Sequence, residues 1–504
     1  MDNALALEMA GIRKNFGSFR ALDDASLDVR WGEVHAILGE NGAGKSSLMN
    51  VAAGLYSPDG GLLRINGQAC DLTGPRDAMA RSVGMIHQHF KLVKRFSAVQ
   101  NVLLANPRGS YRQGLAEIGR EINKHAKALG FDLDLHRPVG LLSVAEQQRV
   151  EIIKTLVAGA RILILDEPTA VLTDEEGAKL LRTISDLAQR GAAIVLVTHK
   201  LRDVQTFADR VTVMRGGRTI ATLNRGTSSD ELATLAVGTK IVAPQRGDGK
   251  PGVERLIVRD LHDESSDQSR LRQVTFTVRS GEIYGIAGVG GNGQTELADI
   301  LSGSRAPSSG HVEAVLPGGA RVDLSSGNPR RRIDFGFAAV PADRQGQAIA
   351  SSVSIVDNYA IAHVHTGRFG PWWRFKRAAA REATSVALRD ADVQGVRSAS
   401  QRVGLLSGGN AQKLVMAREF SRAPKIIIVH SPSRGLDVRA CAAIHRRLLN
   451  AREEGVAVVL ISEDLDEILS LSDRIGVMTA GRIVAEFDAS GDRQAIGRAM
   501  VGHV

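Results

Sequence analysis

A run of nine residues, Gly39-Glu40-Asn41-Gly42-Ala43-Gly44-Lys45-Ser46-Ser47, has the composition and spacing of a loop that binds phosphate. It fits the pattern G-x-x-x-x-G-K-[ST], in which glycines let backbone N–H groups turn inward and form an anion nest. The Lys45 ammonium can reach the β- and γ-phosphates of a nucleotide, and the Ser46 hydroxyl can ligate Mg²⁺. The run therefore predicts a site for a nucleoside triphosphate.

The elements that position this loop can be read from the residues around it. Val34 to Leu38 is an apolar run that predicts the strand leading in, and Ser47 to Val51 can start the helix leading out. The N-terminus of that helix adds positive potential behind the phosphates. Ile162 to Leu165 and Ile194 to Val197 are further apolar runs, as expected for strands buried on both faces of a parallel sheet.

Polar residues follow these strands, and turn and helix signals place the other elements of the first half. The first run ends in Asp166-Glu167-Pro168, the second in Thr198-His199, and a short strand from Val83 to His87 ends at Gln88. Strands are expected from Ile12 to Asp28 around a turn at Gly17-Ser18, with hairpin turns at Asp59-Gly60-Gly61 and Asn66-Gly67. Residues 111–140 are polar and helical in character, and a helix is expected from Leu141-Leu142-Ser143 to Leu156.

The pattern of the first half recurs in the second. Gly32-Glu33 returns as Gly281-Glu282 after 249 positions, and Leu142-Ser143 returns as Leu406-Ser407 after 264 positions. The second copy therefore carries 15 extra residues between its glycine-rich loop and its Leu-Ser helix. Such self-similarity predicts two homologous α/β domains in tandem, at residues 1–242 and 253–504, joined by a short Pro/Gly/charged linker at residues 243–252.

Composition narrows the class of protein. The 504 residues carry a net charge of +9, which suits polyphosphate ligands, an anionic membrane face or nucleic acid. The two cysteines, Cys70 and Cys441, form no metal-binding or CxxC spacing, so a reducing cytoplasm is expected. No apolar run approaches the roughly 20 residues needed to span a bilayer, and the N-terminus lacks a signal-peptide pattern. These features predict a soluble or peripheral protein.

The order and spacing of the motifs over the full length resemble the duplicated ATP-binding subunit of an ABC transporter. In the first half the phosphate loop is followed by Gln88, then Ser143-Val144-Ala145-Glu146-Gln147, then Asp166-Glu167, then His199. The resemblance implies two tandem P-loop ABC ATPase domains of the α/β class, each with an antiparallel β lobe and a helical subdomain. It implies ATP and Mg²⁺ as ligands.

The resemblance also assigns roles to the first-half motifs. Asp166 is placed to hold Mg²⁺ through water, together with Ser46. Glu167 is the candidate general base, and His199 can contact the γ-phosphate and the attacking water. Gln88 can ligate Mg²⁺ and report the nucleotide state to a partner. Phe16 can stack on adenine.

The second half departs from the family pattern at most of these positions. Its loop has Gln294 in place of the lysine, and its strand Ile426 to Val429 ends in His430-Ser431 instead of Asp-Glu. Glu463 stands where His199 stands in the first copy, and Pro341-Ala342-Asp343-Arg344 takes the place of the glutamine loop. Its Leu406-Ser407-Gly408-Gly409-Asn410, however, is close to the LSGGQ signature of the family.

ABC domains resembling these bind ATP between two copies arranged head to tail, so the halves are expected to pair within the chain. One composite site then joins the intact first-half loop to Ser407, Gly408 and Gly409. The other joins the degenerate second-half loop to Ser143, Val144 and Ala145, whose Cβ atoms hinder approach to a γ-phosphate. All the damage therefore falls on one of the two sites, which predicts a division of labour.

The function implied is the ATPase of an importer at the cytoplasmic face of the membrane. It would drive two separate permease subunits fed by an external substrate-binding protein, with no nucleic acid involved. The segment Phe90 to Leu104 could form part of the groove for a permease helix, or could be ordinary core. The run Ile86-His87-Gln88-His89-Phe90 looks more like the nucleoside branch of the simple-sugar and nucleoside importers, with a ribose- or galactose-type importer as the alternative.

A rival class is a soluble tandem ABC protein that acts on the ribosome or on nucleic acid, which the charge of +9 would suit. Such proteins usually have a long charged helical linker and two intact sites. This chain has a short linker and one degenerate site, so the importer is the favoured interpretation.

Overall fold

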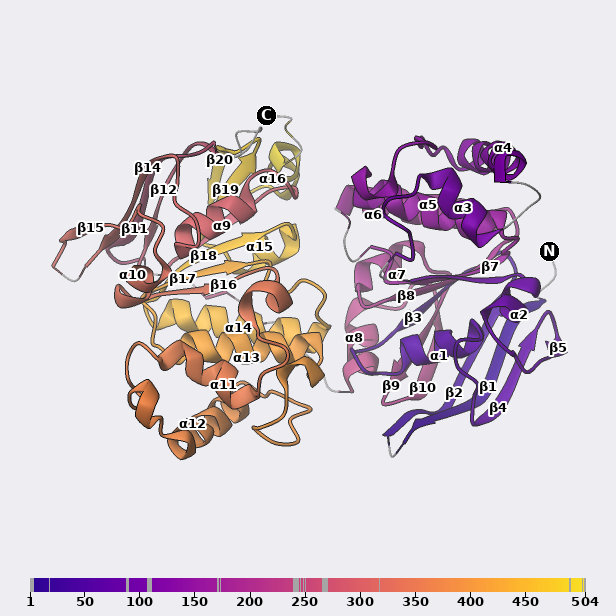
Figure 1. The fold of residues 1–504 in the computed structure, drawn as a ribbon, viewed down its shortest axis with the longest axis horizontal. Coiled ribbons are helices and arrows are strands. Elements are labelled where there is room, and N and C mark those ends of the chain that lie inside the picture. Colours follow the sequence, from indigo (N-terminus) through magenta and orange to yellow (C-terminus); the bar gives the residue numbers. More distant parts are fainter. Residues whose placement is uncertain are drawn as a thin grey trace. The chain divides into compact units, whose positions relative to one another are not determined.

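The computed structural model describes every residue except 1–3, 18, 88–89, 107–110, 170–171, 173, 239–243, 245, 248, 250, 265–270, 317, 489–490, 501 and 503–504. Contacts within the chain divide it into two compact units, Met1–Ile241 and Val242–Val504 (Figure 1). Several residues of the predicted linker at 243–252 lie outside the described part, so the predicted domain bounds stay a prediction.

A six-stranded sheet forms the centre of the first unit, with the strand order β10-β9-β3-β8-β7-β6. All its strands are parallel except β10, which pairs with β9 in the antiparallel sense. Because parallel strands point the same way, the segments that follow β3, β6, β7 and β8 emerge at one edge. The strands are β3 (Val34–Leu38), β6 (Val83–Ile86), β7 (Ile162–Asp166), β8 (Ala193–Thr198), β9 (Arg210–Arg215) and β10 (Arg218–Asn224).

An antiparallel lobe of order β2-β1-β4-β5 packs against this sheet. It consists of β1 (Leu5–Phe16), β2 (Phe19–Arg30), β4 (Gly60–Ile65) and β5 (Gln68–Ala69). The Asn66-Gly67 hairpin turn is confirmed between β4 and β5, but the turn expected at Asp59-Gly60-Gly61 is wrong, because Gly60 and Gly61 begin β4. A Cβ atom on Gly61 would lie 2.6 Å from the Gly11 carbonyl oxygen of β1, so glycine is needed where the two strands approach.

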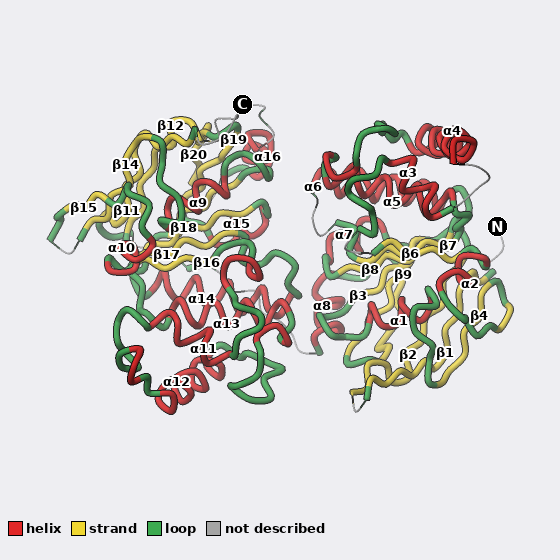
Figure 2. The backbone as a smooth tube through the Cα atoms, in the orientation of Figure 1, coloured by secondary structure: helices red, strands yellow, loops and turns green. Residues whose placement is uncertain are grey.

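Helices cover the other face of the six-stranded sheet, as Figure 2 shows. Leu163 and Leu165 of β7 pack with α5 and α6, whereas Ile162 and Ile164 pack with α1 and the lobe. This alternation explains why β7 is apolar from Ile162 to Leu165. The helices are α1 (Lys45–Ala52), α2 (Pro75–Ala80), α3 (Ala98–Ala105), α4 (Tyr111–Leu129), α5 (Val144–Val157), α6 (Asp174–Gln189), α7 (Leu201–Phe207) and α8 (Ser229–Val237), with a 3₁₀ turn η1 (Val139–Leu141).

Two helical predictions need correction. The helical character expected over residues 111–140 ends with α4 at Leu129, because Gly130 adopts a φ of 65° and the chain then leaves the helix. The helix after the phosphate loop begins at Lys45, two residues before the predicted start. No helix in the part of the chain that the structure describes is both long and apolar enough to cross a membrane.

The second unit repeats the architecture, with a six-stranded sheet of order β16-β17-β18-β13-β19-β20 and a lobe of order β12-β11-β14-β15. The predicted two-copy fold is thereby confirmed. Its strands are β11 (Glu254–Asp263), β12 (Leu271–Arg279), β13 (Ile283–Ala287), β14 (Ser309–Val315), β15 (Arg321–Asp323), β16 (Phe337–Val340), β17 (Ile426–His430), β18 (Ala457–Ser462), β19 (Arg474–Thr479) and β20 (Arg482–Asp488).

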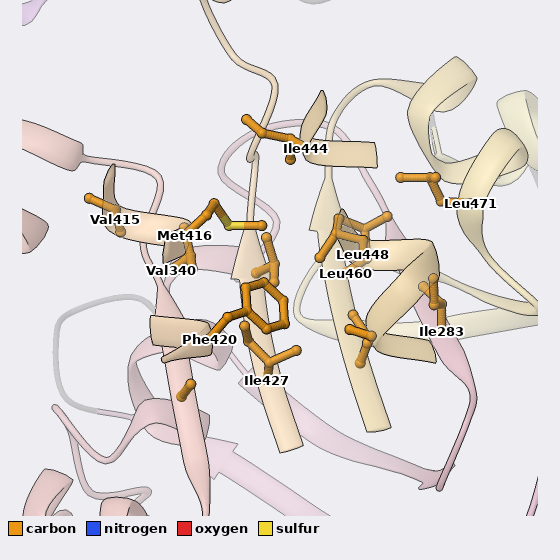
Figure 3. Packing of buried hydrophobic residues seen from close by; sticks show 14 of the residues in the cluster. Ile283, Val340, Val415, Met416, Phe420, Ile427, Ile444, Leu448, Leu460 and Leu471 are labelled. Atoms are coloured by element: carbon orange, nitrogen blue, oxygen red, sulfur yellow. The ribbon is translucent and has the colours of Figure 1, made fainter. Parts of the chain in front are cut away.

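The core of the second unit lies between this sheet and its helices (Figure 3). Ile427 of β17 and Leu460 of β18 face Phe420 of α13 and Leu448 of α14, and all four side chains are buried. The helices are α9 (Gln294–Ser302), α10 (Pro329–Asp334), α11 (Ile355–Ala360), α12 (Arg377–Asp390), α13 (Gly408–Phe420), α14 (Val438–Glu453), α15 (Leu465–Leu471) and α16 (Arg493–Met500). Short turns are η2 (Arg344–Ala348), η3 (Ile361–His363), η4 (Trp372–Arg374) and η5 (Val403–Leu405).

Candidate nucleotide site

The loop between β3 and α1 has the backbone of an anion nest. Gly42 and Gly44 adopt φ values of 87° and 98°. Residues other than glycine rarely adopt this left-handed conformation. The buried Lys45 donates hydrogen bonds from Nζ to the carbonyl oxygens of Gly39 at 2.7 Å and Glu40 at 3.0 Å. A Cβ atom on Gly39 would lie 2.3 Å from the Met214 carbonyl oxygen, so the loop has no room for a larger residue there.

Ser46 and Asp166 meet at the edge of the sheet. Asp166 is the last residue of β7, and its carboxylate accepts a hydrogen bond from the side chain of Ser46 in the first turn of α1. Burial raises the pKa of Asp166 above its ordinary value, and the charge of Glu167 adds to this, while Ser46 and Lys45 act in the opposite direction. A buried carboxylate destabilised in this way gains by binding a cation.

Glu167 and His199 form a pair beside Asp166. The Glu167 Oε1 atom lies 3.1 Å from Nδ1 of His199, and both side chains are largely buried. Burial alone would raise the pKa of Glu167, but the hydrogen bond and charge of His199, with Lys45 and Lys200, hold that pKa below its ordinary value. The carboxylate therefore stays ionised, as a general base must be.

The backbone aims Glu167 into the site. Its φ of 49° is left-handed, which is uncommon for a residue that is not glycine, and its N–H donates to the Val197 carbonyl oxygen at 2.9 Å. Ser431, the equivalent residue of the second copy, has a φ of 45° and donates to Ile461 at 2.8 Å. The turn thus belongs to the fold of both copies, whereas the carboxylate is present in one.

Sequence reasoning missed the residues that support this turn. The buried Gln148 of α5 donates from Nε2 to the Pro168 carbonyl oxygen at 2.7 Å. Lys200 donates to the Thr169 carbonyl oxygen at 3.0 Å, and the Thr169 hydroxyl lies 2.6 Å from Asp203. The recurrence of Gln148 as Gln412 in the second copy was the one signal in the sequence that could have identified it.

Two predicted ligands stand apart from this cluster. Phe16 ends β1, remains 43% exposed, and meets Tyr56 edge-on with ring centroids 5.2 Å apart. The Lys14 ammonium lies 5.8 Å from the Phe16 ring. The role of Phe16 at adenine stays a prediction. Gln88 lies outside the described residues.

The corresponding loop of the second unit keeps the shape of the first loop. It has a neutral residue in place of the lysine, and a carboxylate lies against it. Gln294 is buried and donates from Nε2 to the Val289 carbonyl oxygen at 2.9 Å, much as Lys45 bonds its own loop. A Cβ atom on Gly290 would lie 2.7 Å from Oε1 of Glu463, so this carboxylate lies against the loop backbone. Burial and Arg434 lower the pKa of His430 to about 4, which keeps that imidazole neutral.

The two Leu-Ser signatures start equivalent helices. Ser407 caps α13 and accepts a hydrogen bond from the Asn410 amide Nδ2 at 2.9 Å, and exposed Gly408 opens the helix. Ser143 caps α5 in a capping box with Glu146, and its neighbour Val144 is 42% exposed. The surface beside the cap is therefore bare backbone at Gly408 and a branched side chain at Val144.

The residues present fit ATP and a magnesium ion. The nest, the lysine and the helix N-terminus suit phosphates, while Ser46 and Asp166 offer adjacent oxygen ligands of the kind Mg²⁺ takes. Among the described residues no three His, Cys, Asp or Glu side chains gather as a metal site. A magnesium ion at this position would therefore share its coordination with nucleotide phosphates and water.

The ABC transporter family model matches residues 22–170 and again residues 271–434, so the chain belongs to the ABC transporter family as a duplicated ATP-binding ATPase. The predicted family, fold class and ATP ligand are thus confirmed.

Curated relatives match over nearly the whole chain. A glucose import ATP-binding protein of Haloferax volcanii is 39% identical, with 98% of this chain and 96% of the relative covered. A nucleoside import ATP-binding protein of Lactococcus lactis is 37% identical, with coverage of 100% and 99%. A guanosine import ATP-binding protein of Bacillus subtilis is also 37% identical, with coverage of 98% and 97%.

A solved structure of an RNase-L inhibitor resembles the chain with a TM-score of 0.64 at 19% identity, covering 100% of this chain and 93% of that one. At that identity the likeness shows the tandem fold alone.

Proposed function

We propose that this chain is the ATP-hydrolysing subunit of an ABC importer and that hydrolysis takes place at the first copy's loop. The observation that carries the proposal is the cluster of Lys45, Ser46, Asp166, Glu167 and His199 at one edge of one sheet. Full-length relatives at 37–39% identity that carry import names support the transport role.

In this proposal each side chain has a defined task. Lys45 places its charge at the β- and γ-phosphates, and the loop N–H groups hold their oxygens. Glu167 accepts a proton from the attacking water, and His199 keeps the carboxylate oriented and ionised. A Mg²⁺ ion bound at Ser46 and Asp166 would neutralise charge on the phosphates.

The signature of one copy is proposed to close the site of the other. In this arrangement the exposed backbone of Gly408 approaches the γ-phosphate bound at Lys45, while Gly409 is buried behind it. At the second loop the same approach meets Val144, and Glu463 repels the phosphates. Hydrolysis is therefore proposed at one site of the two.

Permease subunits are proposed to dock in a groove of the second unit. A cavity of about 930 Å³ lies between β16, α11 and α13, with Val353, Ile361 and Val364 on its exposed rim. Apolar grooves of this kind accept an amphipathic helix. In the first copy, Val99 and Val102 are core residues, so the exposed side chains of the predicted segment, such as Phe96 and Leu104, are the ones that could serve such a contact.

Fractionation with and without the permeases tests this role. The wild-type chain should move to the membrane fraction of a sucrose gradient only when the permeases are co-expressed. Val353→Glu should prevent this, whereas Val484→Glu, at a similarly exposed valine on β20, should not. Co-sedimentation with ribosomes in place of membranes would contradict the proposal and favour a soluble translation factor.

A nucleoside is the proposed substrate class, with a simple sugar as the alternative. The run Ile86-His87-Gln88-His89-Phe90 supports it, as do relatives named for nucleoside and guanosine import, although another is named for glucose. The companion binding protein should melt at a higher temperature with nucleosides, since a ligand at about 100 Kd adds about 2.7 kcal/mol. A shift with free ribose, glucose or galactose only would reject the nucleoside.

A further inference from the structure

The second copy has a longer connection between the first two helices of its helical subdomain. Residues 361–376 join α11 to α12, whereas residues 106–110 join α3 to α4 in the first copy. The connection in the second copy is therefore 11 residues longer than its counterpart in the first. We call residues 361–381, which include the first residues of α12, the basic aromatic segment; Figure 1 shows it at the end of its unit away from the lobe.

The segment is built on packed aromatic rings. Phe369 is buried, with its ring centroid 5.4 Å from His363 and 6.1 Å from Phe375. The Lys376 N–H donates to the Phe369 carbonyl oxygen at 2.7 Å, which closes the loop. This internal packing means that the outward-facing side chains are held on a defined surface.

That surface combines apolar and cationic side chains. Trp373 is 72% exposed, Ile361 64% and Val364 53%. Five cations accompany them, and no Asp or Glu occurs between residues 358 and 381, so the stretch is strongly positive; the cations are Arg368, Arg374, Lys376, Arg377 and Arg381. Asp357 pairs with Arg377 at 3.1 Å, and the exposed Glu382 follows Arg381 at the end of the segment.

Two kinds of polyanion could meet such a surface. Exposed tryptophan with arginine and lysine suits either nucleic acid or the headgroup region of a membrane. Ile361 and Val364 decide between them, because exposed aliphatic side chains in the same segment have no partner on a nucleic acid but can enter the headgroup boundary. Val364 and Phe375 also line the groove proposed for the permease, so the surface continues from a membrane-facing site.

We propose that the basic aromatic segment rests on anionic phospholipid headgroups beside the permease, with Trp373 at the lipid–water boundary and the cations on the lipid phosphates. That this surface faces the bilayer rests on the proposed function. Its affinity for anionic lipid does not depend on that function. This lipid contact is a second attachment to the membrane, in addition to the permease, and it does not depend on bound nucleotide.

Vesicle flotation of the full-length chain tests the proposal without any permease. The wild type should float with vesicles of phosphatidylcholine and phosphatidylglycerol in equal parts, should not float with phosphatidylcholine alone, and should be released by salt. Arg374→Ala with Lys376→Ala should lower the affinity about fivefold per cation removed. Trp373→Ala should weaken binding also at raised salt, because its contribution is not electrostatic.

Lys124→Ala with Lys127→Ala is the matched control, because it removes two exposed cations from α4, the counterpart of α12 in the first copy. This variant should float like the wild type. Equal losses in both pairs would overturn the proposal, because they would mean that overall charge attracts the vesicles. So would binding only to neutral vesicles that contain the permease, or a segment-dependent affinity for single-stranded DNA that exceeds the affinity for vesicles.

ATP hydrolysis separates this test from the proposed function. The segment variants should hydrolyse ATP at the wild-type rate in detergent. A chain that binds anionic vesicles through the segment but shows no hydrolysis would leave the lipid contact standing and remove the proposed function. The reverse result would remove the lipid contact alone.

Discussion

At the scale of single residues, the two copies differ most in the charge that faces the phosphate loop. Lys45 is buried under the first loop and His199 lies beside Glu167, the proposed general base. In the second copy the equivalent residues are the neutral Gln294 and the anionic Glu463, whose carboxylate lies against Gly290. We therefore propose that a polyphosphate binds more favourably at the first loop than at the second.

Glu167→Gln should keep ATP binding and lose hydrolysis by about 10²–10⁴-fold, since the amide has the shape of the carboxylate but accepts no proton. Steady-state hydrolysis and nucleotide binding on the same preparation would measure this. Asp71→Asn is a suitable comparison, because it changes an exposed carboxylate outside the site. Hydrolysis near the wild-type rate in Glu167→Gln would mean that another group is the base.

Asp166→Asn should melt at a higher temperature than the wild type in the absence of nucleotide and metal. The pKa of Asp166 is raised in the folded chain, so its ionised form costs stability above that pKa, and the cost disappears as pH falls below the unfolded value. The gap in Tm should therefore be widest at neutral pH and narrow on acidification.

Thermal melts of the apo protein across pH, with the exposed Asp71→Asn as control, measure this effect. A Tm for Asp166→Asn below that of the wild type at neutral pH would contradict the claim that the ionised Asp166 carboxylate destabilises the folded chain. The same variant should lose hydrolysis, because it loses the proposed metal ligand.

At the scale of elements, the two signature helices are matched at their caps. Ser143 accepts a hydrogen bond from the N–H of Glu146, and Ser407 accepts one from the N–H of Asn410. Removing either hydroxyl should cost about 1 kcal/mol of helix stability. A difference in ATPase activity between Ser143→Ala and Ser407→Ala therefore reflects the nucleotide site that each helix is proposed to close. It does not reflect a difference in helix stability.

Ser407→Ala should reduce hydrolysis far more than Ser143→Ala, with similar losses of thermal stability. The reason is that Ser407 is proposed to close the site of Lys45, whereas Ser143 closes the degenerate one. ATPase rates and melting temperatures of both variants in the assembled transporter check this. Equal losses of hydrolysis would show that both sites share the work.

The sequence predicted most elements because their signals are local. The strand Val34–Leu38 was predicted with its observed bounds, since a mostly apolar run directly before a glycine-rich loop leaves little choice. Gly60-Gly61 was misread as a turn because its glycines serve a contact with β1, which lies far away in sequence. Residues 130–138 were misread as helix because their polarity does not distinguish helix from irregular chain.

The site was predictable as a set of residue types but not as a geometry. Motif spacing identified Asp166, Glu167 and His199, whereas the left-handed φ of Glu167 and the support from Gln148 depend on how α5 packs over β7. The carboxylate of Glu463 against Gly290 is likewise a tertiary contact that no local pattern encodes. Gln88 and the pairing of the two copies stay predictions.

At the scale of the whole molecule, the duplication places equivalent machinery in both units and retains its chemistry in one. The two six-stranded sheets share one strand order, and the turn at Glu167 recurs at Ser431 with its backbone hydrogen bond. The second unit carries the groove proposed for the permease and the basic aromatic segment. We infer that one unit is specialised for hydrolysis and the other for attachment.

The ATPase rates of Lys45→Ala and Gln294→Ala in the assembled transporter test this account most directly. Lys45→Ala should lower hydrolysis by about 10²–10³-fold or more, because it removes the charge on the phosphates. Gln294→Ala should leave most hydrolysis intact, although it removes the equivalent buried side chain and its hydrogen bond to Val289. Comparable losses in the two variants, or full activity in Lys45→Ala, would contradict a single working site in the first copy.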